Sequence, residues 1–334
     1  MTKQVTKQAT EQANKQPIFN RLALIGFGLI GGSIARAARA QGAVRSIVAT
    51  ARSPQTRKRI AELGVADQVV ESNAAAVEGA DLVIVCIPVG ACGEVAKEIG
   101  PHLANGAVVS DVGSVKGAVL RDMAPHLPPH VHFVPAHPVA GTEDSGPDAG
   151  FAELFVNRWC ILTPPPDADA AAVEKLKTFW TRLGANVETM PADHHDLVLG
   201  ITSHLPHLIA YTIVGTADEL SSVTRSEVLK FSAGGFRDFT RIAASDPTMW
   251  RDVFLANKDA VLEMLGRFNE DLAALTRAMR SGDGQTLFDH FARTRAIRRG
   301  IVEIGQDSPA PDFGRSHVAL PAEPLPRPYA ADTE

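Results

Sequence analysis

A chain of 334 residues is long enough for about two domains of ordinary size. Its 45% hydrophobic and 21% charged content suits a globular protein with a sizeable core, and excludes collagen, fibrous coiled coil and a fully disordered chain. The net charge of −5 predicts no basic surface for nucleic acid, and no apolar run reaches the ~18–20 residues of a membrane span. The cysteines (Cys86, Cys92 and Cys160) are too few for a disulfide scaffold, which favours a reducing, cytoplasmic setting.

Residues 21–189 alternate short apolar runs with helix-forming segments. Strands are predicted over 21–25, 46–50, 81–87, 107–111, 132–135, 159–163 and 186–189, and helices over 33–41, 55–63 and 171–183. The run 81–87 is almost continuously apolar, as in a strand covered on both faces. The alternation predicts an α/β domain with a Rossmann-type, doubly wound parallel sheet.

No convincing strand follows Pro191. Residues 194–219 are apolar at helical spacing, and residues 288–304 form a last, Arg-rich helix. Between them, apolar residues recur at alternating steps of four and three: Val261, Leu265, Phe268, Leu272, Leu275 and Met279. Such a stripe packs against another helix. The second half is predicted as all-helical, with the stripe packed internally, pairing two chains as a homodimer, or both.

A glycine-rich loop follows the first predicted strand. It reads G-x-G-x-x-G, in Gly26, Phe27, Gly28, Leu29, Ile30 and Gly31. A strand before it and a helix after it are the context of a dinucleotide-binding loop. Gly26 permits the tight turn, Gly28 lets the backbone approach a pyrophosphate, and Gly31 allows close packing of helix on strand. The helix N-terminus would offer free N–H groups to the anion; a βα turn without a ligand is the alternative.

The adenosine ribose of the cofactor would meet the end of the second strand. An NAD site carries an Asp or Glu about 20 residues after the loop. Here Ala51 occupies that place and Arg52 and Ser53 follow, which suit a 2′-phosphate and favour NADP over NAD. The alternative is a solvated Arg52 in an enzyme that takes either cofactor. Pro88 is also predicted to bind the cofactor.

These observations divide the chain into four parts. Residues 1–17 are polar, lack the apolar core of a secretory signal and are predicted as a disordered arm. Residues 18–191 form the dinucleotide-binding domain and residues 192–306 a helical substrate and dimerisation domain. Recurrent prolines predict an extended, disordered tail over 307–334.

Four further motifs carry reactive side chains. SDVGSVK (110–116) and HPVAGTE (137–143) follow predicted strands, at the edge where doubly wound sheets bind ligands. SHLPH (203–207) and DFTRIAASDPTMW (238–250) lie in the helical half. With GFGLIGGS (26–33), they resemble the prephenate/arogenate dehydrogenases of tyrosine biosynthesis, over about residues 20–305. The glycine loop alone would not discriminate, but five motifs in this order are specific.

The resemblance implies a Rossmann domain followed by a helical dimerisation domain. It implies oxidation of prephenate to 4-hydroxyphenylpyruvate, or of arogenate to tyrosine, with loss of CO₂ and hydride transfer to NADP or NAD. The two substrates differ in a keto group against an ammonium, and no single residue here decides between them.

The same resemblance implies roles for individual residues. His137 matches the catalytic histidine, a base for the C4 hydroxyl, since neutral imidazole is available near pH 7. Ser114 matches the serine that bonds the hydroxyl or the histidine. Arg241 matches the arginine that binds a carboxylate, for which its planar fork is suited. The remaining substrate-side residues are Thr142, Glu143, Ser203, His207, Asp238 and Trp250.

Each of these residues also has a purely structural interpretation. His137 would cap a turn, Ser114 would be a helix N-cap beside a solvated Lys116, and Arg241 would pair with Asp238. A metal site is an alternative interpretation of the histidine pair His204 and His207, which has His194, His195 and Asp196 nearby. No cysteine is close in sequence and the reaction needs no metal, so no metal is predicted.

Two other functions compete. One is a related dehydrogenase acting on a β-hydroxyacid or an imino acid; hydroxyacid members use a lysine on the first long helix of the second domain, and residues 197–219 contain none. The other is a non-enzymatic nucleotide sensor, which would not need His137, Ser114 and Arg241 together. We therefore predict a cytoplasmic enzyme that acts on a small molecule, binds neither nucleic acid nor membrane, and dimerises through its helical domain.

Overall fold

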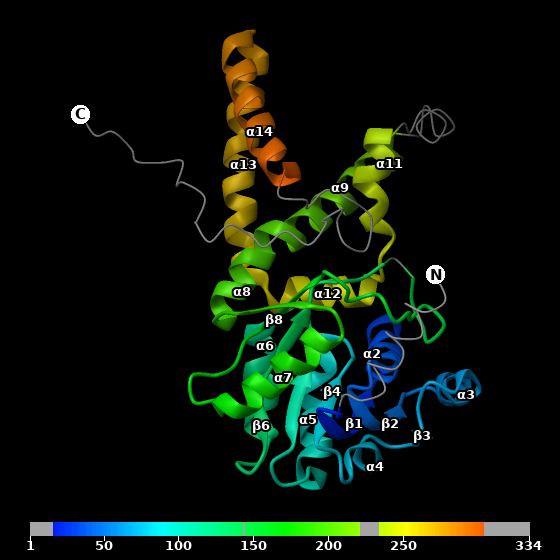
Figure 1. Ribbon diagram of the computed structural model, residues 1–334. Coiled ribbons are helices and arrows are strands. Elements are labelled where there is room, and N and C mark those ends of the chain that lie inside the picture. Colours follow the sequence, from blue (N-terminus) through cyan, green and yellow to red (C-terminus); the bar gives the residue numbers. More distant parts are fainter. Residues whose placement is uncertain (1–15, 143, 221–233, 304–334) are drawn as a thin grey trace, which may run out of the picture.

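The computed structural model describes residues 16–142, 144–220 and 234–303. Glu143, the predicted tail and nearly all of the predicted N-terminal arm lie outside this part of the chain. Figure 1 shows a sheet domain with a helical domain stacked on it. Two groups of helices, α13 with α14 and α9 with α11, diverge away from the sheet.

Six parallel strands form the main sheet, in the order β3-β2-β1-β4-β5-β6. They are β1 Phe19–Ile25, β2 Val44–Thr50, β3 Gln68–Val69, β4 Leu82–Val85, β5 Val108–Asp111 and β6 His132–Phe133. The helices between them are α2 Leu29–Ala40, α3 Pro54–Leu63, α4 Asn73–Val77, α5 Cys92–Ile99 and α6 Lys116–Met123. The predicted Rossmann-type fold is confirmed. The order reverses between β1 and β4, so their carboxyl ends border the crevice in which such sheets bind ligands.

The central strands are buried on both faces. In β1, Leu22 and Leu24 join one apolar cluster while Ala23 and Ile25 join the other. Because successive side chains of a strand point to opposite faces, two separate cores result, one on each side of the sheet. This accounts for the nearly continuous apolar runs in the sequence.

A separate sheet holds the last three strands. It contains β7 Ala136–Pro138, β8 Trp159–Leu162 and β9 Asn186–Thr189, and α7 Ala170–Arg182 connects the last two. β7 is antiparallel to β8, so the prediction that these segments continue one parallel sheet is wrong. Pro135 has no N–H to donate to the ladder of the main sheet, and its carbonyl accepts from Thr163 N–H at 2.9 Å. The chain therefore leaves the main sheet there, which places β7 beside β5.

The helical domain begins at α8. Its elements are α8 Ala192–Leu199, a π-helical turn Gly200–His204, α9 Leu205–Leu220, α11 Gly234–Thr240, a 3₁₀ turn Arg241–Ala244, α12 Pro247–Ala256, α13 Lys258–Ser281 and α14 Gly284–Glu303. The single helix predicted over 194–219 is thus interrupted. Pro206 has no N–H and its ring crowds the carbonyl of Thr202, so the preceding turn widens and Leu205 N–H bonds to Gly200 O.

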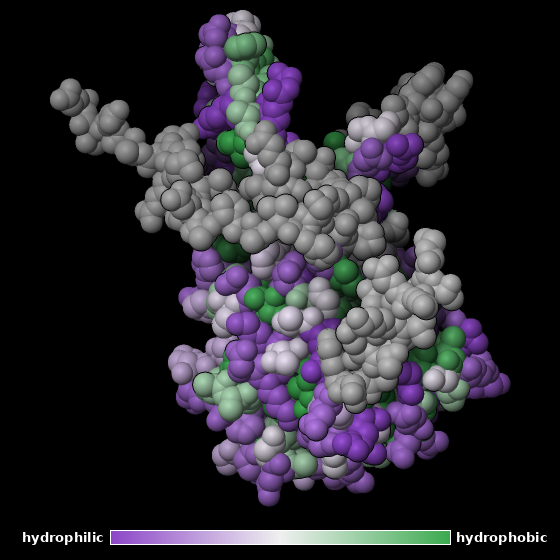
Figure 2. Space-filling model, in the orientation of Figure 1, coloured by the Kyte–Doolittle hydropathy of each residue, from purple (hydrophilic) through white to green (hydrophobic). Residues whose placement is uncertain are grey.

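The apolar stripe of α13 is only partly covered. Val261 is buried, whereas Leu272 and Met279 are 48% and 59% exposed. α13 ends at Gly282, which has a left-handed backbone, and α14 returns against it. Figure 2 shows hydrophobic residues running along this projecting hairpin between hydrophilic flanks. Its exposed apolar side chains include Leu262, Leu272, Met279, Phe288, Phe291 and Ile297.

One helical stretch, Ala192–Glu219, is long and apolar enough to cross a membrane by length and composition, with a mean hydropathy of 1.5 over an 18-residue window. It is not a continuous apolar run, since Ser203, His204 and His207 interrupt it. The core helix of a globular protein passes the same test. Here the stretch carries the buried polar residues His195, Asp196 and His204, and Asp196 is hydrogen-bonded to the sheet domain.

Candidate active site

The glycine loop has the shape that a pyrophosphate requires. Gly26 has φ +89°, and a Cβ there would lie 2.4 Å from the carbonyl oxygen of Cys86. A Cβ on Gly31 would lie 2.5 Å from the oxygen of Gly26, so neither position accepts a side chain. A Cβ on Gly28 would meet nothing within 4 Å. Gly28 is the N-cap of α2 and no side chain caps that helix, so its first N–H groups are available to an anion.

The other residues of the loop pack inward. Phe27 and Leu29 are buried in the core and Ile30 is half-buried against it, so these residues offer backbone rather than side chain to a cofactor. Pro88 is exposed and begins the short turn that precedes α5.

We call residues 51–57, which follow β2, the adenosine corner; they include the predicted cofactor residues Ala51, Arg52 and Ser53. Arg52 is exposed, and Ser53 caps α3, its Oγ accepting from Thr56 N–H at 3.3 Å. Arg57, which the sequence analysis did not single out, donates to the carbonyls of Ala51 at 2.8 Å and Arg52 at 3.1 Å. The corner therefore holds two arginines and no acid, and its serine is partly engaged as a cap.

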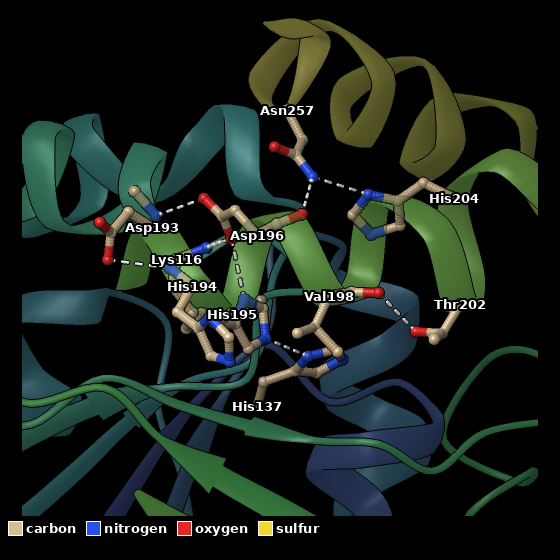
Figure 3. A network of polar contacts seen from close by, with 12 residues as sticks. Lys116, His137, Asp193, His194, His195, Asp196, Val198, Thr202, His204 and Asn257 are labelled. Carbon is tan, nitrogen blue, oxygen red and sulfur yellow. Dashed lines mark hydrogen bonds and ion pairs between the residues drawn. The ribbon is translucent and has the colours of Figure 1, made fainter. Parts of the chain in front are cut away.

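A chain of three side chains joins the two domains (Figure 3). His137 lies on β7, and His195 and Asp196 lie on α8. His137 Nδ1 is 2.8 Å from His195 Nε2, and His195 Nδ1 is 2.8 Å from Asp196 Oδ1. All three residues are buried. The family resemblance predicts His137 as the base, whereas the sequence offers His195 and Asp196 no role beyond a metal site.

Asp196 caps helix α6 from the other domain. Its Oδ1 accepts from Lys116 N–H at 2.7 Å, and its Oδ2 accepts from Gly117 N–H at 2.8 Å. A Cβ on Gly117 would lie 2.9 Å from that Oδ2, so glycine allows the close approach. The carboxylate thereby satisfies two N–H groups at the start of the helix, which have no partner within it. The N-cap residue itself is Val115, so the interpretation of Ser114 as the cap is wrong; Ser114 is half-buried just before it.

A fully buried ion pair lies beside the histidines. Lys116 Nζ bonds to Asp111 Oδ2 and donates to Ala136 O at 2.7 Å. Asp111 also accepts from Gly113 N–H at 2.7 Å and Ala136 N–H at 3.2 Å. The interpretation of Lys116 as solvated is wrong. The pair fixes the end of β5 against β7 and thereby the backbone that carries His137.

Burial keeps His137 neutral. Loss of water lowers the pKa of His137 well below 6.5, and the charges of His195 and Lys116 act in the same direction. Burial also lowers the pKa of His195, against the opposing effect of Asp196. In the described part of the chain His137 Nε2 makes no hydrogen bond, and the residue keeps 7% of its surface exposed. Nε2 is therefore the ring nitrogen left to bond to a ligand.

Three predicted substrate residues meet on the helical side. The rings of His207 and Trp250 stack with centroids 3.7 Å apart, and His207 Nδ1 bonds to Ser203 O at 2.8 Å. Burial, followed by the charge of Arg241, lowers the pKa of His207, which places that arginine nearby. Tyr211 OH donates to Ser245 O at 2.8 Å and holds the turn that begins with Arg241 against α9.

Asn257 connects this side to the catalytic chain. Its amide donates to Asp196 O at 2.8 Å and to His204 Nδ1 at 3.0 Å. Burial lowers the pKa of His204 to about 4, against the opposing effect of a backbone hydrogen bond with Ser114. Trp250 Nε1 is enclosed without a hydrogen-bond partner among the described residues. Within residues 16–142, 144–220 and 234–303, no group of three or more His, Cys, Asp or Glu side chains is placed to hold a metal.

The remaining predicted residues are more peripheral. Thr142 is exposed, and its Oγ1 accepts from Asp144 N–H at 3.3 Å. Asp238 is exposed and pairs with its neighbour Arg237 at 3.0 Å. Glu143 lies outside the described residues.

The loop after β7 runs back over helix α2. Phe151 N–H donates to Ser33 Oγ at 3.1 Å, and Arg36 Nη2 donates to Pro147 O at 3.2 Å. The loop that follows the His137 strand is thereby held against the helix that follows the glycine loop.

A dinucleotide loop at the switch point of a Rossmann sheet, and a buried neutral histidine whose following loop bonds to the helix after that dinucleotide loop, are typical of a nicotinamide-dependent dehydrogenase. Two family models match this chain: the nucleotide-binding domain of prephenate dehydrogenase over residues 34–189 and its dimerization domain over 191–293. The chain belongs to the prephenate/arogenate dehydrogenase family, and the predicted resemblance is confirmed.

Individual relatives support this family assignment. The chain is 42% identical to the cyclohexadienyl dehydrogenase of Zymomonas mobilis over 284 residues, 85% of this chain and 97% of that protein. It is 33% identical to the prephenate dehydrogenase of Bacillus subtilis, over 91% of this chain and 81% of that one. Among solved structures, prephenate dehydrogenase of Aquifex aeolicus, in complex with hydroxyphenyl propionate and NAD⁺, has a TM-score of 0.79 and 33% identity. That match covers 84% of this chain and 98% of the other.

Proposed function

We propose that this enzyme oxidatively decarboxylates prephenate, arogenate or both, in the biosynthesis of tyrosine. The observation that carries the proposal is the neutral, buried His137, whose Nε2 makes no hydrogen bond within the described residues and whose strand precedes the loop that bonds to helix α2. The names of the Zymomonas, Bacillus and Aquifex relatives support it, as does the hydroxyphenyl ligand bound to the Aquifex protein.

The chemistry requires one base and one cationic contact. The ring hydroxyl at C4 gives its proton to His137 Nε2, a hydride leaves C4, and the bond from C1 to the carboxylate breaks. The electrons of that bond make the ring aromatic, and His137 returns the proton to the phenolate oxygen. The nicotinamide, when bound, accepts the hydride. No net proton is released, so His137 begins and ends the cycle neutral.

The residues of the helical side would bind and orient the substrate. Arg241 pairs with a substrate carboxylate, for which its fork of donors is suited. Ser114 bonds the hydroxyl or His137. We assign the rest of the substrate side to Thr142, Glu143, Ser203, His207, Asp238 and Trp250. The dinucleotide is held by residues 26–31, by residues 51–53 and by Pro88.

We further propose that NADP is preferred over NAD. The arginines at 52 and 57 and the absence of an acid at the end of β2 support this preference, because a carboxylate there would repel a 2′-phosphate. Cofactor reduction measured as kcat/KM with prephenate and with arogenate, each with NADP and NAD, tests the activity. Turnover of a β-hydroxyacid or imino acid, with none of either cyclohexadiene, would overturn the proposal.

The assembly we propose is a cytoplasmic homodimer, with domains at residues 18–191 and 192–306. The matched dimerization domain and the exposed apolar hairpin of α13 and α14 support a pair of chains joined through the helical half. Sedimentation at micromolar concentration should give twice the mass of 35.5 kDa. A monomer there would contradict the dimer.

A further inference from the structure

His195 and Asp196 have no part in the activity as described above, yet they are bonded in series to its base. We propose that they are positioning residues: they hold His137 in the tautomer whose Nε2 is unprotonated, and they stabilise its cation after proton uptake. The inference rests on the proposed function of His137.

The tautomers follow from the acidic end of the chain. Asp196 already accepts two backbone N–H bonds, so its carboxylate is an acceptor for every neighbour. His195 Nδ1, 2.8 Å away, must therefore carry a hydrogen and donate it. A neutral His195 then has its lone pair on Nε2, which lies 2.8 Å from His137 Nδ1. His137 Nδ1 must donate, and its Nε2 is left unprotonated toward the ligand.

The charges around the pair explain why a neutral histidine alone would be a poor base here. Lys116, Asp111, Asp196 and His204 are the titratable groups that face the two rings. Lys116 and Asp111 pair with each other, which leaves Asp196 as the unbalanced negative charge. When His137 takes a proton, a cation appears in a site that lacks water. The carboxylate of Asp196, acting through His195, stabilises this imidazolium and so lowers the free energy of forming it, as the acid does in a hydrolase triad.

Two substitutions at one position separate positioning from packing. His195→Phe removes both hydrogen bonds and should lower kcat about 100-fold with KM nearly unchanged, within the ~10²–10⁴-fold range of a base's contribution. His195→Gln can present its carbonyl to His137 Nδ1–H and should recover about tenfold of that loss. His194→Gln alters the exposed neighbour on the same helix and should stay within about twofold of the parent. Equal, small losses in Phe and Gln variants would overturn the role of His195.

Asp196→Asn tests the charge. Its Oδ1 can still accept from His195 and Lys116 N–H, while the negative charge and the bond from Gly117 N–H to Oδ2 are lost, so kcat should fall about tenfold with KM unchanged. An unchanged kcat would remove Asp196 from the positioning chain. His137→Asn is measured beside these variants. If His137→Asn keeps its turnover, the proposed function fails. If it loses turnover while the His195 and Asp196 variants keep theirs, only the present inference is overturned.

A measurement on the parent protein needs no variant. The ring ¹⁵N chemical shifts of labelled histidines report which ring nitrogen carries the hydrogen. The His137 signal is assigned as the one that is missing from the spectrum of His137→Asn. We expect the Nδ1–H form at pH 7. A dominant Nε2–H form would overturn the proposal whatever the kinetics show.

Discussion

Two corners of the same sheet edge bear on the same reaction and are built in opposite ways. Around His137, polar groups from β5, α6, β7 and α8 are buried and bonded to one another. At the end of β2, Arg52 is exposed and Arg57 bonds to backbone carbonyls of the turn. The first corner fixes protonation states, and the second offers charge to whatever binds beside it.

The surroundings of each corner set the size of its effects. A charge interaction in a site without water is several times stronger than one at the surface, where salt screens it beyond about 8–10 Å. Changing the buried corner should therefore alter chemistry and stability by large factors. Changing the exposed corner should shift only the choice between two cofactors.

The largest effect is expected at the base. His137→Asn should reduce kcat by about 10²–10⁴-fold, because the amide of asparagine cannot take the hydroxyl proton, while the Kd for NADP stays close to that of the parent. Stopped-flow kinetics measures kcat, and cofactor fluorescence measures the Kd for NADP. A kcat near that of the parent would remove His137 from the mechanism. It would also contradict the expectation that changes at the buried corner have larger effects than changes at the exposed corner.

Next comes the buried ion pair. Lys116→Met leaves Asp111 charged and without its partner, which should lower the free energy of unfolding by about 3–5 kcal/mol. The double change with Asp111→Asn should be less destabilised than Lys116→Met alone, because no uncompensated charge remains. Lys97→Met, on the exposed last turn of α5, is the matched control and should change the urea midpoint little. A small effect at Lys116 would show that the corner tolerates an isolated carboxylate.

Arg241 tests an exposed charge on the substrate side. Arg241→Gln should raise KM about 10- to 100-fold with little change in melting temperature, since a charge-assisted contact contributes about 1.5–3 kcal/mol. Arg121→Gln, on the exposed side of α6 and paired with Asp122, serves as control and should leave KM unchanged. A collapse in melting temperature at constant KM would instead make Arg241 a structural residue.

What the sequence could predict follows the same division. The glycine loop is a local device: six consecutive residues set its backbone, so its pattern can be read directly, and the structure agrees at Gly26 and Gly31. His137 was found through a motif that follows a strand. His195 lies 58 residues further along, and its bond to His137 depends on how α8 packs on α6, which no local pattern encodes. The run His194-His195-Asp196 at a helix start was the available signal.

The sequence does not predict two details of the fold, and the physical reasons are related. The separate sheet of β7, β8 and β9 depends on Pro135 leaving the main ladder, although its apolar strands look like those before it. The π turn before Pro206 interrupts a stretch whose apolar spacing is that of one helix. In both cases a proline was visible, but its consequence depended on the neighbouring chain.

The smallest effect is expected at the adenosine corner. Ala51→Asp combined with Arg52→Ala should reverse the preference for NADP, because the new carboxylate accepts from the ribose diol and the phosphate loses a cation. Arg57 stays in this variant and still donates to the turn, so the NADP side of the ratio should fall by about tenfold rather than vanish. Arg45→Ala, at the opposite end of β2, is the charge-matched control. The measurement is kcat/KM for both cofactors at low and high salt: the parental preference should weaken as salt rises, since Arg52 is exposed. A parent that prefers NAD would refute the preference, and a ratio untouched by the double change would show that these residues do not set it.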